Sequence, residues 1–259
     1  MVVPTRGRVV EHRALGRGGY YLLLEAPQVA ATAQPGQFVH LRVSETYDPL
    51  LRRPFSLHEV DRAAGRIAVL YRVRGRGTSG LANRQPGEYL DLLGPLGRGF
   101  PTPQAGTSAL LVGGGTGVAP LYFLATELKR WGVGAHLLLG AATADELWRL
   151  SAFEGLGLPL EVATEDGSLG MRGRVTDLLP DRLGSSPTQV FAAGPWPMLR
   201  RVADWAAEAG IPAFVSLEQV MACGTGLCLG CAVPVVGGYV RACSEGPVFA
   251  AEEVLWDEA

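Results

Sequence analysis

The residues best suited to chemistry are four cysteines near the C-terminal end of the 259-residue chain. They are spaced Cys223-x4-Cys228-x2-Cys231-x11-Cys243, with glycines between the first three. Three thiolates in a short loop and a fourth farther along are typical of a plant-type 2Fe–2S cluster. Glycine allows the tight turns that such a loop needs, and nearby amide groups tune the cluster. The spacing therefore predicts a 2Fe–2S cluster held by these four cysteines.

Zinc, disulfides and free thiols are the alternatives. Structural zinc sites usually show two C-x2-C pairs, whereas here the first gap is four residues and the fourth cysteine stands alone. Disulfides need an oxidising compartment. Residues 1–8 lack the apolar core of a signal peptide, so we expect a cytoplasmic protein with reduced thiols. Zinc remains the minority alternative.

A glycine-rich turn lies in the middle of the chain, where Leu110–Val112 reads as a buried strand and Ala119–Arg130 as a helix. Its residues are Gly113, Gly114, Gly115, Thr116 and Gly117. A helix N-terminus approached through glycines favours a bound phosphate. The dinucleotide fingerprint G-x-G-x-x-G nearly fits, but its last position is Val118. The turn predicts a nucleotide site, with a tight turn that binds no ligand as the alternative.

A second candidate is the run Arg53-Pro54-Phe55-Ser56. Its guanidinium could pair with a phosphate, and its aromatic ring could pack on a planar ring. Taken alone, the run is better explained as an ordinary strand start. The histidines, His12, His40, His58 and His136, are scattered and are better explained as packed or surface residues than as metal ligands. We predict no catalytic side chain.

The first hundred residues show short apolar runs separated by Gly and Pro turns, which favours a small antiparallel barrel. We expect strands over Arg8–His12, Tyr20–Glu25, Gln37–Val43, Phe55–Val60, Arg66–Val73 and Tyr89–Leu92. One helix is expected over Ser79–Arg84.

After the loop 94–103 the pattern changes to alternating strands and helices, which predicts a parallel α/β sheet. Strands are expected over Ala109–Val112, Ala135–Leu139, Leu160–Thr164, Gln189–Ala192 and Ala213–Ser216, and helices over Ala119–Arg130, Ala144–Arg149, Val175–Leu179 and Pro197–Ala209. The predicted fold is a mixed β and α/β chain: an antiparallel barrel over 1–100, a parallel α/β nucleotide-binding domain over 101–216 and an iron–sulfur segment over 217–259.

Composition excludes several classes of function. The net charge is −2, and 47% of the residues are hydrophobic. Neither value suggests binding to nucleic acid or to an acidic membrane surface. No predicted helix reaches the roughly 20 apolar residues of a membrane span.

The order of the motifs resembles the ferredoxin-reductase superfamily. The run Arg53–Ser56 comes first, the glycine turn follows, and Ala193-Gly194-Pro195-Trp196-Pro197-Met198 comes after a later strand. The resemblance implies a flavin-binding barrel and a lobe that binds a nicotinamide nucleotide. With the cysteine segment added, the whole chain resembles the electron-transfer subunits of NAD-dependent dihydroorotate dehydrogenase.

The resemblance assigns roles to individual residues. FAD would be held by Arg53, Pro54, Phe55, Ser56, Leu70, Tyr71, Arg72, Gly77 and Thr78. The nicotinamide nucleotide would be held by Gly113, Gly114, Gly115, Thr116, Gly117, Gly194, Pro195 and Met198. Acidic residues at Glu165 and Asp166, with no arginine beside them, favour NAD over NADP, and an ordinary solvated turn at these two residues is the alternative.

The resemblance also implies a partner. A catalytic subunit would oxidise dihydroorotate at its FMN, and electrons would pass through the cluster and FAD to NAD+ in pyrimidine (UMP) biosynthesis. The implied assembly is a heterotetramer of two plus two subunits. Two alternatives stay open. One is a related FAD and 2Fe–2S subunit of an NADH-dependent ferredoxin:NADP reductase or a sulfide dehydrogenase, and the other is a zinc-stabilised nucleotide-binding module without enzymatic activity.

Overall fold

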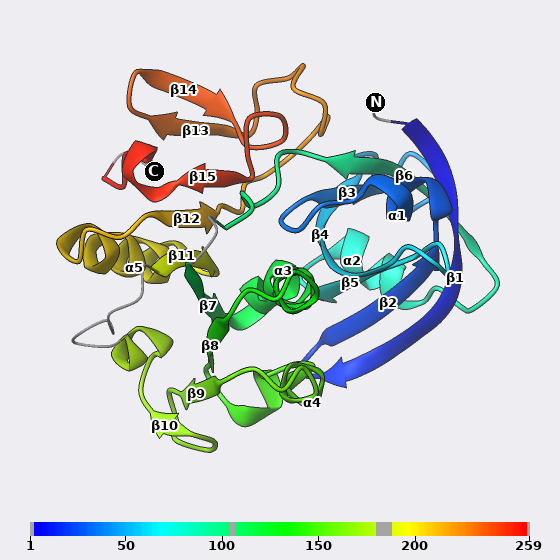
Figure 1. Cartoon of the computed structure of the whole chain (residues 1–259). Coiled ribbons are helices and arrows are strands. Elements are labelled where there is room, and N and C mark those ends of the chain that lie inside the picture. Colours follow the sequence, from blue (N-terminus) through cyan, green and yellow to red (C-terminus); the bar gives the residue numbers. More distant parts are fainter. Residues whose placement is uncertain (1–2, 104–106, 180–187, 258–259) are drawn as a thin grey trace.

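The computed structural model describes residues 3–103, 107–179 and 188–257. Figure 1 shows a barrel beside an α/β layer, with the C-terminal segment at one end. In the described part of the chain no helix is long and apolar enough to cross a bilayer.

The N-terminal barrel is closed and antiparallel, in the strand order β1-β2-β5-β4-β3-β6. Its strands are β1 (Val3–Gly16), β2 (Gly19–Glu25), β3 (Phe38–Leu41), β4 (Arg53–Asp61), β5 (Arg66–Arg72) and β6 (Tyr89–Leu96). Buried leucines and valines on alternate positions fill the barrel, as the period of two requires. The barrel is therefore confirmed. The helix expected at 79–84 begins earlier, as α2 (Arg76–Ala82), and a short α1 (Pro27–Thr32) was not expected.

The second layer is a seven-stranded sheet in the order β10-β9-β8-β7-β11-β12-β15. Its members are β7 (Ser108–Gly114), β8 (Ala135–Ala141), β9 (Leu160–Thr164), β10 (Met171–Arg172), β11 (Thr188–Ala193), β12 (Ala213–Ser216) and β15 (Val248–Ala250). The parallel strands and the helices α3 (Val118–Arg130) and α5 (Trp196–Glu208) confirm the predicted α/β layer.

Two predicted helices of the α/β layer are wrong in form. The segment expected over 144–149 is a 3-10 turn, η2 (Ala144–Glu146), and α4 (Leu150–Glu154) follows it. Arg149 separates the two because it takes a left-handed backbone with φ 65°. The segment expected over 175–179 is a 3-10 helix, η3 (Val175–Leu178). Single turns such as these commonly take the tighter 3-10 form.

The cysteine segment does not simply follow the last strand of the sheet. It forms a hairpin of β13 (Ala232–Val235) and β14 (Gly238–Arg241), and it then returns to the sheet as β15, antiparallel to β12. The short η4 (Ala251–Glu253) comes after β15. The added strand satisfies backbone groups of β12 that would otherwise form an open sheet edge. The cluster-binding segment is thereby fixed to the α/β layer.

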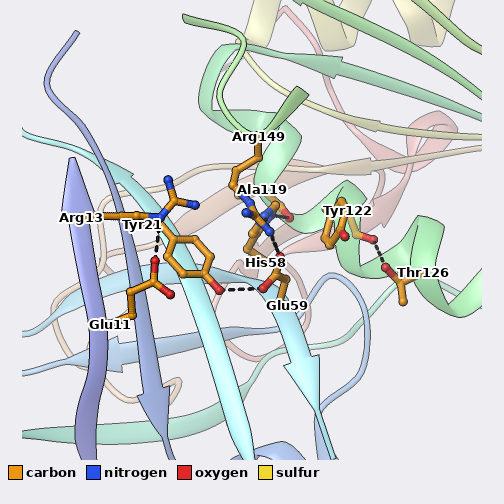
Figure 2. Close-up of polar contacts among 9 residues, drawn as sticks. All are labelled: Glu11, Arg13, Tyr21, His58, Glu59, Ala119, Tyr122, Thr126 and Arg149. Atoms are coloured by element: carbon orange, nitrogen blue, oxygen red, sulfur yellow. Dashed lines mark hydrogen bonds and ion pairs between the residues drawn. The ribbon is translucent and has the colours of Figure 1, made fainter. Parts of the chain in front are cut away.

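A buried polar network joins the barrel to the α/β layer (Figure 2). The Tyr21 hydroxyl on β2 donates to the Glu59 carboxylate on β4 at 2.7 Å. Arg149, just before α4, pairs with the other oxygen of that carboxylate and lies 4.9 Å from the centre of the Tyr21 ring. The adjacent His58 donates from Nδ1 to the carbonyl oxygen of Ala119 in α3, at 3.1 Å. These contacts fix the orientation of the barrel relative to α3.

This interface predicts a pH-dependent stability. Burial lowers the pKa of His58, which faces Glu59 and Arg149, to about 4. An unfolded histidine titrates near pH 6.5, so the unfolded chain takes up a proton between these values that the folded chain rejects. The free energy of unfolding therefore decreases as the pH is lowered through this window. In His58→Gln the decrease in unfolding free energy between pH 7.5 and pH 5 should be about 2 kcal/mol smaller than in the wild type.

Chemical unfolding at both pH values measures the effect. Burial also lowers the pKa of His40 to about 4, but His40 is present in both proteins, so its contribution cancels. His136→Gln is the control, because that side chain is accessible and pairs with Glu161 on the sheet. An equal pH dependence in wild type and His58→Gln would contradict the prediction.

Candidate functional site

Two cavities are lined by predicted site residues. The larger, about 780 Å³, lies at the carboxyl edge of the parallel sheet. The loops after β7 and β11 reach it, as expected for ligand sites of open α/β sheets. Of the residues predicted to hold a nucleotide, six line it: Gly114, Gly115, Thr116, Gly194, Pro195 and Met198. The two segments touch, since a Cβ added to Gly114 would lie 2.5 Å from Met198 Sδ.

The other two glycines of the turn serve packing. A Cβ on Gly113 would meet the side chains of Leu121 and Leu139 at 3.0 and 3.1 Å. A Cβ on Gly117 would lie 2.2 Å from the carbonyl oxygen of Ala193 on β11. These glycines let α3 approach the sheet closely, whereas Gly115, with φ 55° and no neighbour within 4 Å of an added Cβ, faces open space.

A second cavity of about 250 Å³ lies between the barrel and the start of the cysteine segment. Six of the residues predicted to hold a flavin line it: Pro54, Phe55, Ser56, Leu70, Tyr71 and Arg72. The aromatic rings of Phe55 and Tyr71 pack at 5.5 Å. Residues 216–219 and Met221 form the opposite wall. The flavin segments and the cysteine segment therefore face each other across one cavity.

The remaining predicted flavin residues lie beside this cavity. Arg53 reaches the helix α2, because a Cβ on Gly77 would lie 3.1 Å from Arg53 Nε. The guanidinium packs on this glycine and donates to the carbonyl of Leu51 at 2.7 Å, so its expected contact with the flavin pyrophosphate stays a prediction. The Thr78 hydroxyl is already engaged, since it accepts from the backbone N–H groups of Arg74 and Gly75 at 2.9 and 3.2 Å. Its role is to shape the loop before α2.

The two cavities are adjoining. Four residues line both of them, namely Arg72, Arg74, Thr116 and Glu218. Glu218 is solvent-accessible, yet desolvation by the surrounding protein raises the pKa of its carboxyl group, against the opposing effects of Arg74 and a hydrogen bond with Thr116. A titratable carboxyl group therefore stands at the junction of the predicted flavin and nucleotide sites. Sequence reasoning missed Glu218, although a lone carboxylate just after a buried parallel strand is a usable signal.

The outer end of the larger cavity carries charges of both signs. Glu165, which favours NAD in the sequence argument, lines it together with Asp177. Arg174 and Arg201 line it as well, and the sequence argument did not include them. The Arg72 side chain, expected to face a flavin, donates to Glu146 Oε2 at 2.9 Å and so also ties the barrel to the α/β layer.

The four cysteines come together as two pairs. Cys223 lies beside Cys228, and Cys243 lies beside Cys231, with Cys223 close enough to act on Cys243 electrostatically. Burial raises the pKa of the Cys243 thiol, and for Cys223 hydrogen bonds outweigh burial and lower the pKa. Among the described residues, no three potential ligands converge as they would around one metal ion. Two thiolate pairs suit a cluster with two irons.

The loop around the cysteines is shaped for such a group. Backbone N–H groups of Thr225 and Gly226 point at Cys223 Sγ and Cys243 Sγ, at 3.4 and 3.2 Å. Gly226 has φ 83°, a backbone conformation that favours glycine. Arg241 donates to the Gly226 carbonyl at 2.9 Å and pairs with Glu245, whose pKa it lowers to about 2. The donor set and its supporting groups fit a 2Fe–2S cluster.

Comparisons with known proteins agree with these sites. A family model described as the iron-sulfur cluster binding domain of dihydroorotate dehydrogenase B matches residues 218–255. The electron transfer subunit of dihydroorotate dehydrogenase B (NAD(+)) from Geobacillus thermodenitrificans (strain NG80-2) is 44% identical over 260 residues, covering 98% of this chain and 100% of its own. The subunit of the same name from Desulforamulus reducens is 42% identical, covering 92% and 93%.

Solved structures give the same fold. A chain of NADH-dependent reduced ferredoxin-NADP oxidoreductase superposes with a TM-score of 0.86 at 35% identity, covering 97% of this chain and 90% of its own. The ferredoxin reductase of carbazole 1,9a-dioxygenase superposes with a TM-score of 0.69 at 24% identity, covering 82% and 67%, and shows the fold alone. An iron–sulfur family model over the cysteine segment removes support for the zinc alternative.

The packing role of Gly117 can be tested by mutation. Gly117→Ala should lower the free energy of unfolding by about 2 kcal/mol or more, because its Cβ would overlap the carbonyl of Ala193. Gly132→Ala is the control, since Gly132 has φ 71° but no neighbour within 4 Å, and it should cost about 1 kcal/mol of strain. Chemical unfolding measures both, and equal losses would contradict the packing role of Gly117.

Proposed function

Because the chain belongs to the family of electron-transfer subunits of dihydroorotate dehydrogenase B, we propose that it carries electrons from the FMN of a catalytic subunit to NAD+. The path runs through a 2Fe–2S cluster bound by Cys223, Cys228, Cys231 and Cys243, and then through FAD in the cavity lined by the barrel. NAD+ would bind in the larger cavity at the carboxyl edge of the sheet.

The observation that carries this proposal is the order of the sites. The larger cavity adjoins the smaller one through Thr116 and Glu218. The wall of the smaller cavity includes Met221, two residues before Cys223. A nucleotide, a flavin and a cluster bound here would therefore lie in sequence, each next to the following one. An electron relay requires this arrangement, and a nucleotide-binding module without redox activity does not.

The bound groups would supply the redox chemistry, because FAD exchanges single electrons with a cluster and electron pairs with NAD+. The chain's own residues bind, orient and shield these groups. Arg53, which packs on Gly77, would pair with the flavin's phosphates, and Phe55 and Tyr71 would form an apolar wall for its ring system. Glu218 is the titratable group where the flavin and nucleotide cavities meet.

The partner would bind at the cysteine segment. Cys228 is exposed, and the leucines on either side of it, Leu227 and Leu229, are 85% and 65% exposed. Large apolar side chains this accessible are typical of an interaction surface. Electrons must enter the cluster from the partner's FMN, so this surface is where we place the catalytic subunit. We infer an assembly of two plus two subunits in the reducing cytoplasm.

The likeness to NADH-dependent reduced ferredoxin-NADP oxidoreductase keeps a second candidate, a subunit of that kind of complex. The motifs and cavities would serve either complex, so the partner decides. Co-expression with an FMN-containing dihydroorotate dehydrogenase subunit should yield a brown-red complex that reduces NAD+ as it forms orotate. A chain that forms no such complex, or that forms orotate without the partner, would contradict the proposed function.

Cys223→Ser separates the two halves of the relay. NADH should still bleach the flavin absorbance, because the nucleotide and flavin cavities are intact. Orotate-coupled reduction of NAD+ in the complex should fall to background, because the cluster has lost a ligand. Stopped-flow absorbance and an orotate assay measure the two activities, and the NADH half-reaction serves as the internal control for folding. Full coupled activity in this variant would refute the relay.

The docking surface predicts a loss of affinity on charge insertion. Leu227→Glu with Leu229→Glu should weaken binding to the catalytic subunit at least tenfold, since burying each leucine contributes about 1.5–3 kcal/mol. Leu169→Glu is the control, because Leu169 is 41% exposed and lies beside β10, at the opposite edge of the sheet from β15. Titration of the immobilised catalytic subunit measures both. Equal affinity in the three proteins would place the partner elsewhere.

A further inference from the structure

His40 is a fully buried histidine on β3 whose ring nitrogens lack hydrogen bonds of normal geometry. Its side chain is 0% exposed, and neither ring nitrogen makes a hydrogen bond of normal geometry within the described residues. Buried polar groups are normally satisfied, and leaving one unpaired costs free energy. A residue of this kind calls for an explanation beyond packing.

The other histidines are engaged. His12 makes two hydrogen bonds, one at 2.8 Å with the carbonyl of Arg84 and one at 2.9 Å with the Tyr71 hydroxyl. His58 donates to a carbonyl oxygen in α3, and His136 Nε2 lies 2.9 Å from the Glu161 carboxylate. His40 therefore differs from every other histidine of the chain in having both ring nitrogens free of such bonds.

The position of His40 supplies the explanation. In the barrel it pairs with Pro54 on β4, within the predicted flavin segment. On its other side it meets the cysteine loop, because a Cβ added to Gly224 would lie 2.4 Å from His40 Nδ1. The backbones of Arg52 and Cys223 also come close enough to the imidazole to act on it as hydrogen-bond partners, although not with normal geometry. The ring thus fills the space between the flavin strand and the first cluster ligand.

We propose that His40 is a positioning residue for the iron–sulfur cluster, and this proposal rests on the proposed function. The ring holds the segment Cys223–Gly224 against β4 and so sets the separation of cluster and flavin. Its N–H group also places a dipole beside the backbone of Cys223. Two features require glycine at position 224. Its backbone is left-handed, with φ 69°, and any side chain there would displace the imidazole of His40.

Both effects have a physical consequence for the cluster. Hydrogen-bond donors and dipoles near cluster sulfurs stabilise the more negative, reduced form and raise its potential. Replacing the ring by an aliphatic chain of similar bulk removes the dipole while keeping much of the packing. Replacing it by asparagine keeps an amide group near the place of Nδ1. Leucine and asparagine therefore separate the polar from the steric contribution.

The test uses the isolated chain loaded with cluster and FAD. In His40→Leu the reduction potential of the cluster should fall by about 59 mV. For a one-electron couple this changes the equilibrium constant for electron transfer between flavin and cluster about tenfold. His40→Asn should recover most of that shift. An EPR-monitored redox titration measures the potential. Reduction of the flavin by NADH, followed by stopped flow, should remain at the wild-type rate in both variants.

His58→Gln is the matched control, because His58 is equally buried but packs on α3 at the interface of the barrel and the α/β layer. It should leave the cluster potential unchanged. A wild-type potential in His40→Leu, or equal shifts in His40→Leu and His40→Asn, would overturn the proposal. A wild-type chain that gives no cluster signal at all would instead refute the proposed function, so the two failures are distinguishable.

A second pair of variants covers the case in which His40→Leu loses its cluster. Gly224→Ala pushes a methyl group onto the imidazole, whereas Gly226→Ala meets only the Ser244 hydroxyl closely, at 3.1 Å. Both glycines have a left-handed backbone, with φ 69° and 83°, so the strain is matched. Gly224→Ala should shift the cluster potential more than Gly226→Ala does. Equal shifts would show that contact with His40 has no special role.

Discussion

The arrangement of the sites depends on one constraint, that the carboxyl edge of the parallel sheet faces the barrel. The glycine turn leaves β7 at this edge, the segment from Gly194 leaves β11, and Glu218 with the cysteine segment follows β12. Parallel strands deliver their ends to the same edge, so three distant stretches of sequence meet there. The barrel closes the edge from the other side through β4 and β5, which supply the flavin-facing residues.

The interface network in Figure 2 maintains that orientation. Glu59 accepts from both Tyr21 and Arg149, and the side chains of Glu59 and Arg149 are only 24% and 20% exposed. A partly buried ionic group adds little net stability, but it penalises every arrangement that leaves it unpaired. Arg149 reaches the carboxylate from a left-handed backbone with φ 65°, a strain that the surrounding packing must hold. The network therefore contributes orientation more than stability.

The sequence predicted the barrel and the α/β layer because each leaves a local signature, strand period in one and alternating elements in the other. Cysteine spacing is also a local signature, and the four cluster ligands stay a prediction from it. It did not predict β15, whose three residues gain their strand form only by pairing with β12. The glycine motif did not distinguish Gly117, which packs on β11, from Gly115, which faces the cavity. His40 and Glu218 were missed as site residues for the same reason, since their neighbours come from distant segments that no local pattern identifies.

The surroundings of the three sites differ in a way that follows from what each must do. A nucleotide has to enter and leave, and the cavity predicted to hold it is large, about 780 Å³, and is lined by charges of both signs. A flavin stays bound, and the cavity predicted to hold its ring system, about 250 Å³, is lined by barrel and cysteine segment together. A cluster must be fixed toward the flavin and accessible toward a partner. Cys231 and Cys243 are buried, whereas Cys228 is exposed, so the cysteine loop meets both demands with opposite faces.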